Sequence, residues 1–173
     1  MRIVPATLDD LRAIDDLRRK DQESVGFVPM SCYEAEINRG RQTLLVLTES
    51  GETVGYLYWT RGFPVASIQQ VVVRQDARRR ERATALVDAA VAAMKAQGRV
   101  GVTCRCRVNI EGIEFWRSLG WREVRLEQSG RRGPLLRFYR ELSPPLFEIG
   151  VRAAGIPPGH RKGFRRLAME AES

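Results

Sequence analysis

The stretch VVVRQDARRRERATALV, residues 71–87, contains the junction that decides the fold of this chain. Three valines end a predicted buried strand, and an apolar pattern with helical spacing begins ten residues later. The first N–H groups of a helix lack partners within the helix and attract phosphate, although loops that hold phosphate usually carry glycine. This junction has no glycine and instead carries four arginines, Arg78, Arg79, Arg80 and Arg82. It is therefore either a phosphate site without its glycines or a basic helix start with another purpose.

The composition favours a soluble protein with one main domain. A chain of 173 residues with 43% apolar residues suits one domain with a real core, with or without a short appendage. No apolar run approaches the ~18 residues needed to cross a bilayer. The first ten residues turn acidic too early for a secretory signal. We therefore expect an intracellular, cytoplasmic protein that does not enter a membrane.

The net charge of +8 comes almost entirely from arginine. Only Lys20, Lys95 and Lys162 are lysines, so 26 of the 29 basic residues are arginine. Together with the many alanines, this skew is what codon bias in a GC-rich genome produces. The positive field would still attract polyanions. Binding to nucleic acid is therefore compatible with the charge but not indicated by it.

The three cysteines do not predict a disulfide or a metal site. Cys32, Cys104 and Cys106 are an odd number, which is a poor disulfide framework. Strand periodicity places Cys104 and Cys106 on one face, where we interpret both as small buried apolar side chains. The one histidine, His160, is far away in the sequence, and we predict no metal.

Hydrophobic periodicity predicts a mixed α/β chain with about seven strands and four helices. Thr7 is placed to begin the first helix, with Asp10 three residues later. In that helix Leu8, Leu11, Ile14 and Leu17 form one apolar stripe. The expected strands cover residues 1–4, two segments within 43–59, and 65–73, 100–108, 121–127 and 135–142; the expected helices cover 6–21, 31–40, 83–94 and 109–120.

The composition changes at Ser143, which predicts a domain over residues 1–142 and a separate extension over 143–173. The extension contains two Pro-Pro pairs and a basic cluster around Arg165, and we expect one or two short helices there. Phe164 and Leu167 have the spacing of one helical stripe. The extension either joins a protein partner in a larger assembly or caps an exposed sheet face of its own domain.

The order of the predicted elements, with two motifs, resembles the GNAT acyltransferase superfamily over roughly residues 1–142. In the family's acyl-CoA loop, a strand ending in valine leads to Arg or Gln, two residues, Gly, one residue, and Gly or Ala. Val73, Arg78 and Ala83 occupy these places. The second motif, NIEGIEFWRSLGW at residues 109–121, is similar to the family's Asn…Phe-Tyr…Gly-Phe segment.

The resemblance implies an N-acyltransferase that moves an acetyl or related acyl group from acetyl-CoA, or another acyl-CoA, to an amine. The amine would belong to a small molecule or a protein. In the family the amine attacks the thioester directly, and a backbone amide near the end of a splayed strand stabilises the oxyanion. By position, Val71 and Val73 would face the pantetheine arm through their backbones, and Asn109 would line its far side. The pyrophosphate would lie on the loop, with Arg78, Arg79, Arg80, Arg82 and Ala83.

Three residues depart from the family pattern. Arg79 stands where many members have glycine, and Glu81 takes the central glycine position, which adds a carboxylate beside the expected phosphate. Trp116 stands where the family often has a tyrosine that acts as the general acid, so Tyr139 or a water would have to protonate the leaving thiolate, or the thiolate leaves unaided. These departures support an alternative, a catalytically degenerate GNAT-fold binding or structural module. A third hypothesis is a GNAT relative that acts on nucleic acid.

The acceptor cannot be identified from the residues. In the family, acceptor pockets are built largely from the first two helices and late loops. The corresponding candidates here are Glu23, Tyr33 and Arg131.

Overall fold

The computed structural model describes residues 1–22, 24–78, 81–108, 112–128 and 133–142 as a seven-stranded mixed sheet with four α-helices. The strands lie in the order β1-β2-β3-β4-β5-β7-β6, and only the β4–β5 pair is parallel. The predicted α/β fold is therefore confirmed. The strands are β1 (Arg2–Pro5), β2 (Leu44–Glu49), β3 (Glu52–Thr60), β4 (Val65–Val73), β5 (Gly101–Arg107), β6 (Arg122–Glu127) and β7 (Leu135–Glu141). The helices are α1 (Leu11–Lys20), α2 (Met30–Asn38), α3 (Arg82–Ala96) and α4 (Gly112–Ser118), with 3-10 turns η1 (Leu8–Asp10) and η2 (Gln75–Ala77).

The first helical segment begins as the sequence predicts. The backbone N–H of Thr7 donates a hydrogen bond to the Asp10 carboxylate over 2.8 Å, which satisfies a donor at the helix start. Ile14 and Leu17 are buried, as expected for an apolar stripe. Leu8 is 50% exposed, so its predicted place in the stripe is wrong. It lies in the 3-10 turn before α1, where the 3.6-residue period does not apply.

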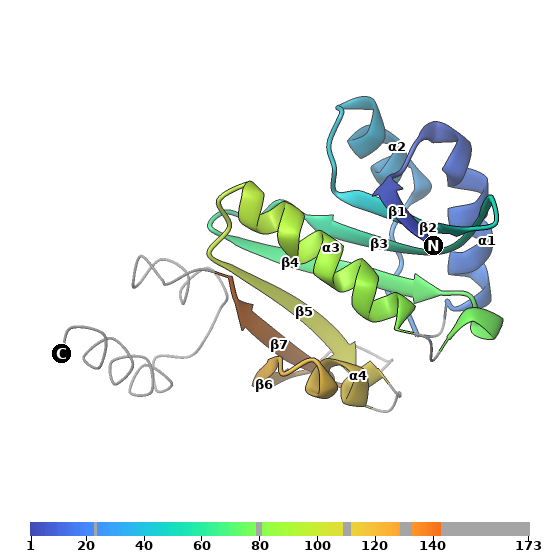
Figure 1. Cartoon of the computed structure of the whole chain (residues 1–173). Coiled ribbons are helices and arrows are strands. Elements are labelled where there is room, and N and C mark those ends of the chain that lie inside the picture. Colours follow the sequence, from blue (N-terminus) through green and yellow to red (C-terminus); the bar gives the residue numbers. More distant parts are fainter. Residues whose placement is uncertain (23, 79–80, 109–111, 129–132, 143–173) are drawn as a thin grey trace.

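Of three hydrophobic clusters among the described residues, the two larger ones fill the two faces of the sheet. Figure 1 shows α3 lying along one face, whereas α1 and α2 lie beside the N-terminal strands. Alternate residues of β3 belong to different cores: Leu57 and Trp59 pack with α3, and Tyr56 and Tyr58 pack with α1 and α2. This separation follows from the period of two in a strand. Each helical layer therefore packs against its own apolar face of the sheet.

The two strand cysteines lie on one face of the sheet, as predicted, and this is the face that α3 covers. Cys104 and Cys106 are buried, and Arg105 between them is exposed. Burial raises the pKa of both thiols, that of Cys106 to about 11. Both therefore stay protonated at neutral pH and pack as apolar side chains.

The predicted extension over residues 143–173, with its partner-binding or capping role, lies outside the described residues. Within the described part of the chain, no helix combines the length and apolar character that crossing a membrane requires.

Candidate active site

Strands β4 and β5 separate halfway along their length. They pair from Val65 with Gly101 to Ile68 with Cys104, and the pairing stops there. Beyond that point β4 stays paired with β3 to Val73, and β5 stays paired with β7 to Arg107. Figure 1 shows the two strands diverging toward the end at which α3 begins. Among the described residues, each strand therefore has an open edge there.

The peptide groups of Val71 and Val73 face the gap between the strands. The backbone N–H of Arg74 donates to the Val54 carbonyl over 2.8 Å, so this N–H points toward β3. The Val72 carbonyl also points that way, since a Cβ added to Gly55 would lie 2.9 Å from its oxygen. Successive peptide groups of a strand point to opposite edges, so those of residues 71 and 73 point toward β5. An open strand edge of this kind can pair with an extended ligand.

A β-bulge interrupts β4 at the point of separation. Tyr58 pairs with Gln70 and Trp59 pairs with Ile68, which leaves Gln69 as an extra residue. Gln69 donates from Nε2 to Ser67 Oγ over 2.9 Å and to Thr60 Oγ1 over 3.3 Å. Because of the bulge, both glutamines direct their side chains to the face covered by α1 and α2.

Gln70 is buried, and its hydrogen bonds join β4 to α2, to β3 and to the segment at Gly26. Its Oε1 accepts hydrogen bonds from the hydroxyls of Tyr33 and Tyr56, and its Nε2 donates to the Gly26 carbonyl. Tyr33, which was predicted to line the pocket for the acceptor substrate, is fully buried. Its hydroxyl ties α2 to β4 and is not exposed to a substrate.

The buried tyrosines predict a loss of stability at high pH. Burial raises the pKa of Tyr33 to about 12, and burial also raises the pKa of Tyr56. A tyrosine with a raised folded-state pKa contributes stability below its unfolded-state pKa of about 10. That contribution decreases as pH rises from about 10 toward 12. We expect urea unfolding to show this decrease, with a shallower one in Tyr33→Phe; equal slopes in both proteins would contradict the assignment.

The two described arginines of the junction have different partners. Arg78 is 46% exposed on its side chain; its Nη2 lies 2.9 Å from Asp21 Oδ2, and its Nε donates to the Val73 carbonyl over 3.0 Å. Arg82 is buried and forms a two-point ion pair with Glu49, with Nε to Oε1 at 2.8 Å. It also donates from Nη1 to the Ala77 carbonyl over 3.0 Å. Arg82 therefore fixes the start of α3 to the end of β2, and its guanidinium does not point to the loop surface.

Glu81 has the backbone conformation that glycine prefers. It is the N-cap of α3, with φ 58° and ψ 4°, and its side chain is exposed without a capping hydrogen bond. A side chain in this left-handed conformation carries a conformational cost that glycine avoids. The glycine of the family motif therefore suits this position through backbone conformation as well as through space for phosphate.

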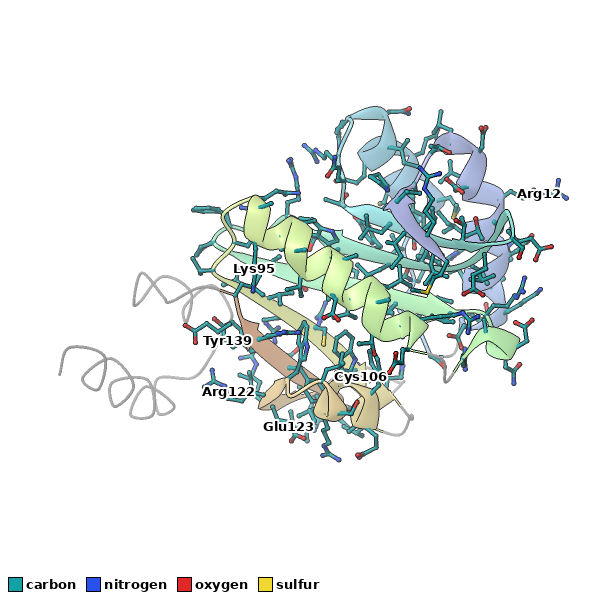
Figure 2. The ribbon with its side chains drawn as sticks, in the orientation of Figure 1. Arg12, Lys95, Cys106, Arg122, Glu123 and Tyr139 are labelled. Carbon is teal, nitrogen blue, oxygen red and sulfur yellow. The ribbon has the colours of Figure 1, made fainter. Side chains whose placement is uncertain are left out.

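Tyr139 does not lie at the separation of the strands, as a proton donor would. Tyr139 is buried, and its hydroxyl lies against Gly101, three residues or about 10 Å along β5 before the last β4–β5 pair. Figure 2 shows Tyr139 toward the Lys95 end of α3, with Cys106 nearer the diverging end. Trp116 is buried against Trp121, with ring centroids 4.7 Å apart. The structure therefore does not bring Tyr139 to the site.

Other predicted site residues are placed only in part. Ala83 lies half-buried in the first turn of α3, where it packs against the core. Arg79, Arg80, Asn109, Glu23 and Arg131 lie outside the described residues.

A pocket beside the bulge was not predicted from the sequence. It has a volume of about 360 Å³. Hydrogen bonds from Thr43 and Arg41 outweigh the burial of Glu36 and lower the pKa of its carboxyl. The lining residues come from α2, β3 and the turns that flank them, so no local motif announces the pocket. They are Glu36, Arg41, Tyr58, Thr60, Arg61 and Gly62.

Comparison with known proteins agrees with this geometry. The acetyltransferase (GNAT) domain family matches residues 15–137. No curated protein sequence matches the chain significantly.

Solved structures have the same fold at low sequence identity. Ard1 from Thermoplasma volcanium has a TM-score of 0.73 at 16% identity, over 82% of this chain and 97% of that one. Ribosomal-protein-alanine N-acetyltransferase from Brucella melitensis has a TM-score of 0.68 at 21% identity, over 82% and 100%. YncA, a putative acetyltransferase from Salmonella typhimurium solved with acetyl-CoA, has a TM-score of 0.69 at 19% identity, over 83% and 94%. With its family match over most of the sheet and its parted β4 and β5, the chain belongs to the GNAT acetyltransferases.

Proposed function

We propose that this protein is an N-acyltransferase that uses acetyl-CoA, or a related acyl-CoA, to acylate an amine. The observation that carries the proposal is the separation of β4 from β5 next to the start of α3. This arrangement provides an extended slot for the pantetheine arm and, at its end, the unpaired N–H groups of a helix start for phosphate.

The described residues fit an acyl-CoA at this slot. The peptide groups of Val71 and Val73 would pair with the amides of the pantetheine arm, as a neighbouring strand would. Arg78 lies next to the slot, since it bonds the Val73 carbonyl, and is exposed enough to contact a phosphate. Arg82 would act indirectly, because its ion pair with Glu49 fixes the helix start that would hold the pyrophosphate.

When bound, the acyl-CoA supplies a thioester carbonyl for direct attack by the amine. A backbone N–H at the bulge around Gln69 would stabilise the developing oxyanion. Gln69 can hold a water with its amide but cannot take a proton. The amine would therefore lose its proton to water, and the thiolate would leave without a tyrosine acid. We expect turnover to rise with pH until the amine is neutral.

Calorimetric titration with acetyl-CoA and CoA tests the proposal directly. Micromolar binding, with release of free thiol when amines are added, is the expected result. Absence of binding up to millimolar acetyl-CoA would instead support the second candidate, a GNAT-fold module without CoA chemistry. That candidate is favoured by Glu81 at the glycine position and by Trp116 buried in the core.

Replacing Glu81 with glycine should tighten CoA binding about tenfold, or roughly 1.4 kcal/mol. The change removes a negative charge and a side chain from the helix start. Glu81→Gln is the matched control, because it removes the charge but keeps a side chain at the helix start. Calorimetry should therefore rank the affinities Gly, then Gln, then Glu. Unchanged or weaker binding in both variants would count against a phosphate site at this loop.

A further inference from the structure

The pocket beside the bulge lies one strand away from the end of the β4–β5 pairing. Thr60 in its wall pairs with Ser67, and the Thr60 hydroxyl accepts from the Gln69 amide. Ser67 in turn pairs with Thr103, one position before the last β4–β5 pair. Adjacent strands lie about 4.8 Å apart, so the pocket wall is within one or two strand spacings of the proposed thioester position.

The side chains around the pocket and those at the separation of the strands point to the same face of the sheet. Tyr58, Thr60, Ser67 and Gln70 share the face covered by α1 and α2, because paired residues point the same way. The bulge directs Gln69 to that face as well. An amine in the pocket would therefore approach the thioester from the side opposite α3.

The pocket and its immediate surroundings carry more positive than negative charge. Both carboxylate oxygens of Glu36 are occupied, since Oε1 lies 2.7 Å from Arg41 Nη1 and Oε2 accepts from Thr43 Oγ1 over 2.9 Å. Arg39 at 3.6 Å adds a second cation to the same carboxylate. Arg61 is exposed and lines the pocket, and its charge helps to lower the pKa of Glu36, although it makes no direct hydrogen bond or ion pair within the described part of the chain.

An exposed guanidinium that lines a small pocket and makes no direct ion pair among the described residues fits an anionic group. It binds carboxylates through two parallel N–H···O bonds, with both charge and geometric selectivity. The volume of about 360 Å³ is at the lower end of the range for small-molecule sites, and the buried ring of Tyr58 forms an apolar wall. A small ligand, with its anionic end at Arg61 and its other end toward Gln69, matches this arrangement.

We propose that this pocket binds the acceptor, a small primary amine that also carries a carboxylate, with Arg61 as the carboxylate-binding residue. This proposal rests on the proposed acyltransferase function. The amine nitrogen attacks the thioester carbonyl and forms the amide C–N bond. The C–S bond breaks, the thiolate of CoA leaves, and the amine proton passes to water.

The test compares amino acids with their own carboxamides, which differ only in the charged group. With acetyl-CoA and wild-type protein, we expect the acid of the best pair to have at least a tenfold higher kcat/KM than its amide. Arg61→Gln should abolish this preference, with the loss in a raised KM for the acid. Arg12→Gln is the matched control, since it removes an exposed arginine of α1 that does not line the pocket. Its preference for the acid should equal that of the wild type.

Other outcomes would overturn the proposal. Equal rates for acids and amides, an undiminished preference in Arg61→Gln, or acetyl-CoA binding without acylation of any amino acid would each do so. A stronger reaction with phosphoethanolamine than with every carboxylate would replace the carboxylate by a phosphate. Calorimetric titration of the same amino acids without acetyl-CoA tests the pocket by itself. Weaker binding in Arg61→Gln than in the wild type is expected there, and this readout holds even where acetyl-CoA does not bind and the proposed function fails.

Discussion

Replacing Trp116 with alanine should lower the free energy of unfolding by about 3–5 kcal/mol. The indole is buried between Phe115 and Trp121, with ring centroids 5.1 and 4.7 Å away. Alanine would remove its apolar surface from the α3-side core and leave a cavity that the neighbouring strands cannot close. Urea unfolding followed by circular dichroism measures the change.

Trp116→Tyr separates packing from chemistry. A phenol keeps most of the ring volume, so we expect a loss below about 1.5 kcal/mol and an intact fold. If turnover at high pH rises in this variant, the phenol reaches the leaving thiolate. A loss as large as that of alanine would show instead that only an indole fills this space.

Replacing Gln70 with leucine should lower the free energy of unfolding by about 2–4 kcal/mol. Leucine has a similar size but leaves the hydroxyls of Tyr33 and Tyr56 and the carbonyl of Gly26 without their partner. Each buried polar group left unpaired costs about 1–3 kcal/mol, and rearranged bonds between the two hydroxyls would recover part of the total. Hydrogen exchange should also increase in α2, because Tyr33 anchors that helix to β4.

Gln69→Leu is the control for this prediction. Gln69 is adjacent, but its hydrogen bonds are only half-buried and involve Thr60 and Ser67 near the pocket. We expect a loss below about 1 kcal/mol, measured by the same unfolding experiment. Equal losses in both glutamine variants would contradict the role of the Gln70 hydrogen bonds in joining these segments.

Much of the fold follows from local patterns in the sequence. The apolar spacing from Ala83 to Met94 predicts α3, whose buried residues include Leu86, Ala90 and Met94. Thr7 and Asp10 predict the first helix start, and Gly98 at φ +72° ends α3 as expected. These features depend on periodicity, capping and backbone preference within a few residues. The motif around residues 78–83 likewise locates the candidate loop.

The sequence could not predict which distant groups become partners. Arg82 was expected to face phosphate, but its guanidinium pairs with Glu49, 33 residues away. Tyr33 was expected near the acceptor, but it bonds Gln70, 37 residues away. Leu8 was likewise predicted to be part of an apolar helical stripe. It lies in a 3-10 turn, where the 3.6-residue period does not hold.

By itself the sequence determined the order of strands and helices and the family, and it predicted the loop for an acyl-CoA, because each of these depends on local spacing. The tertiary structure alone decided where β4 leaves β5, that Gln69 forms a bulge, and that Glu36, Tyr58 and Arg61 line one pocket. The physical reason is register. Shifting a strand pair by one residue turns every side chain to the other face, and register is set by packing over the whole sheet.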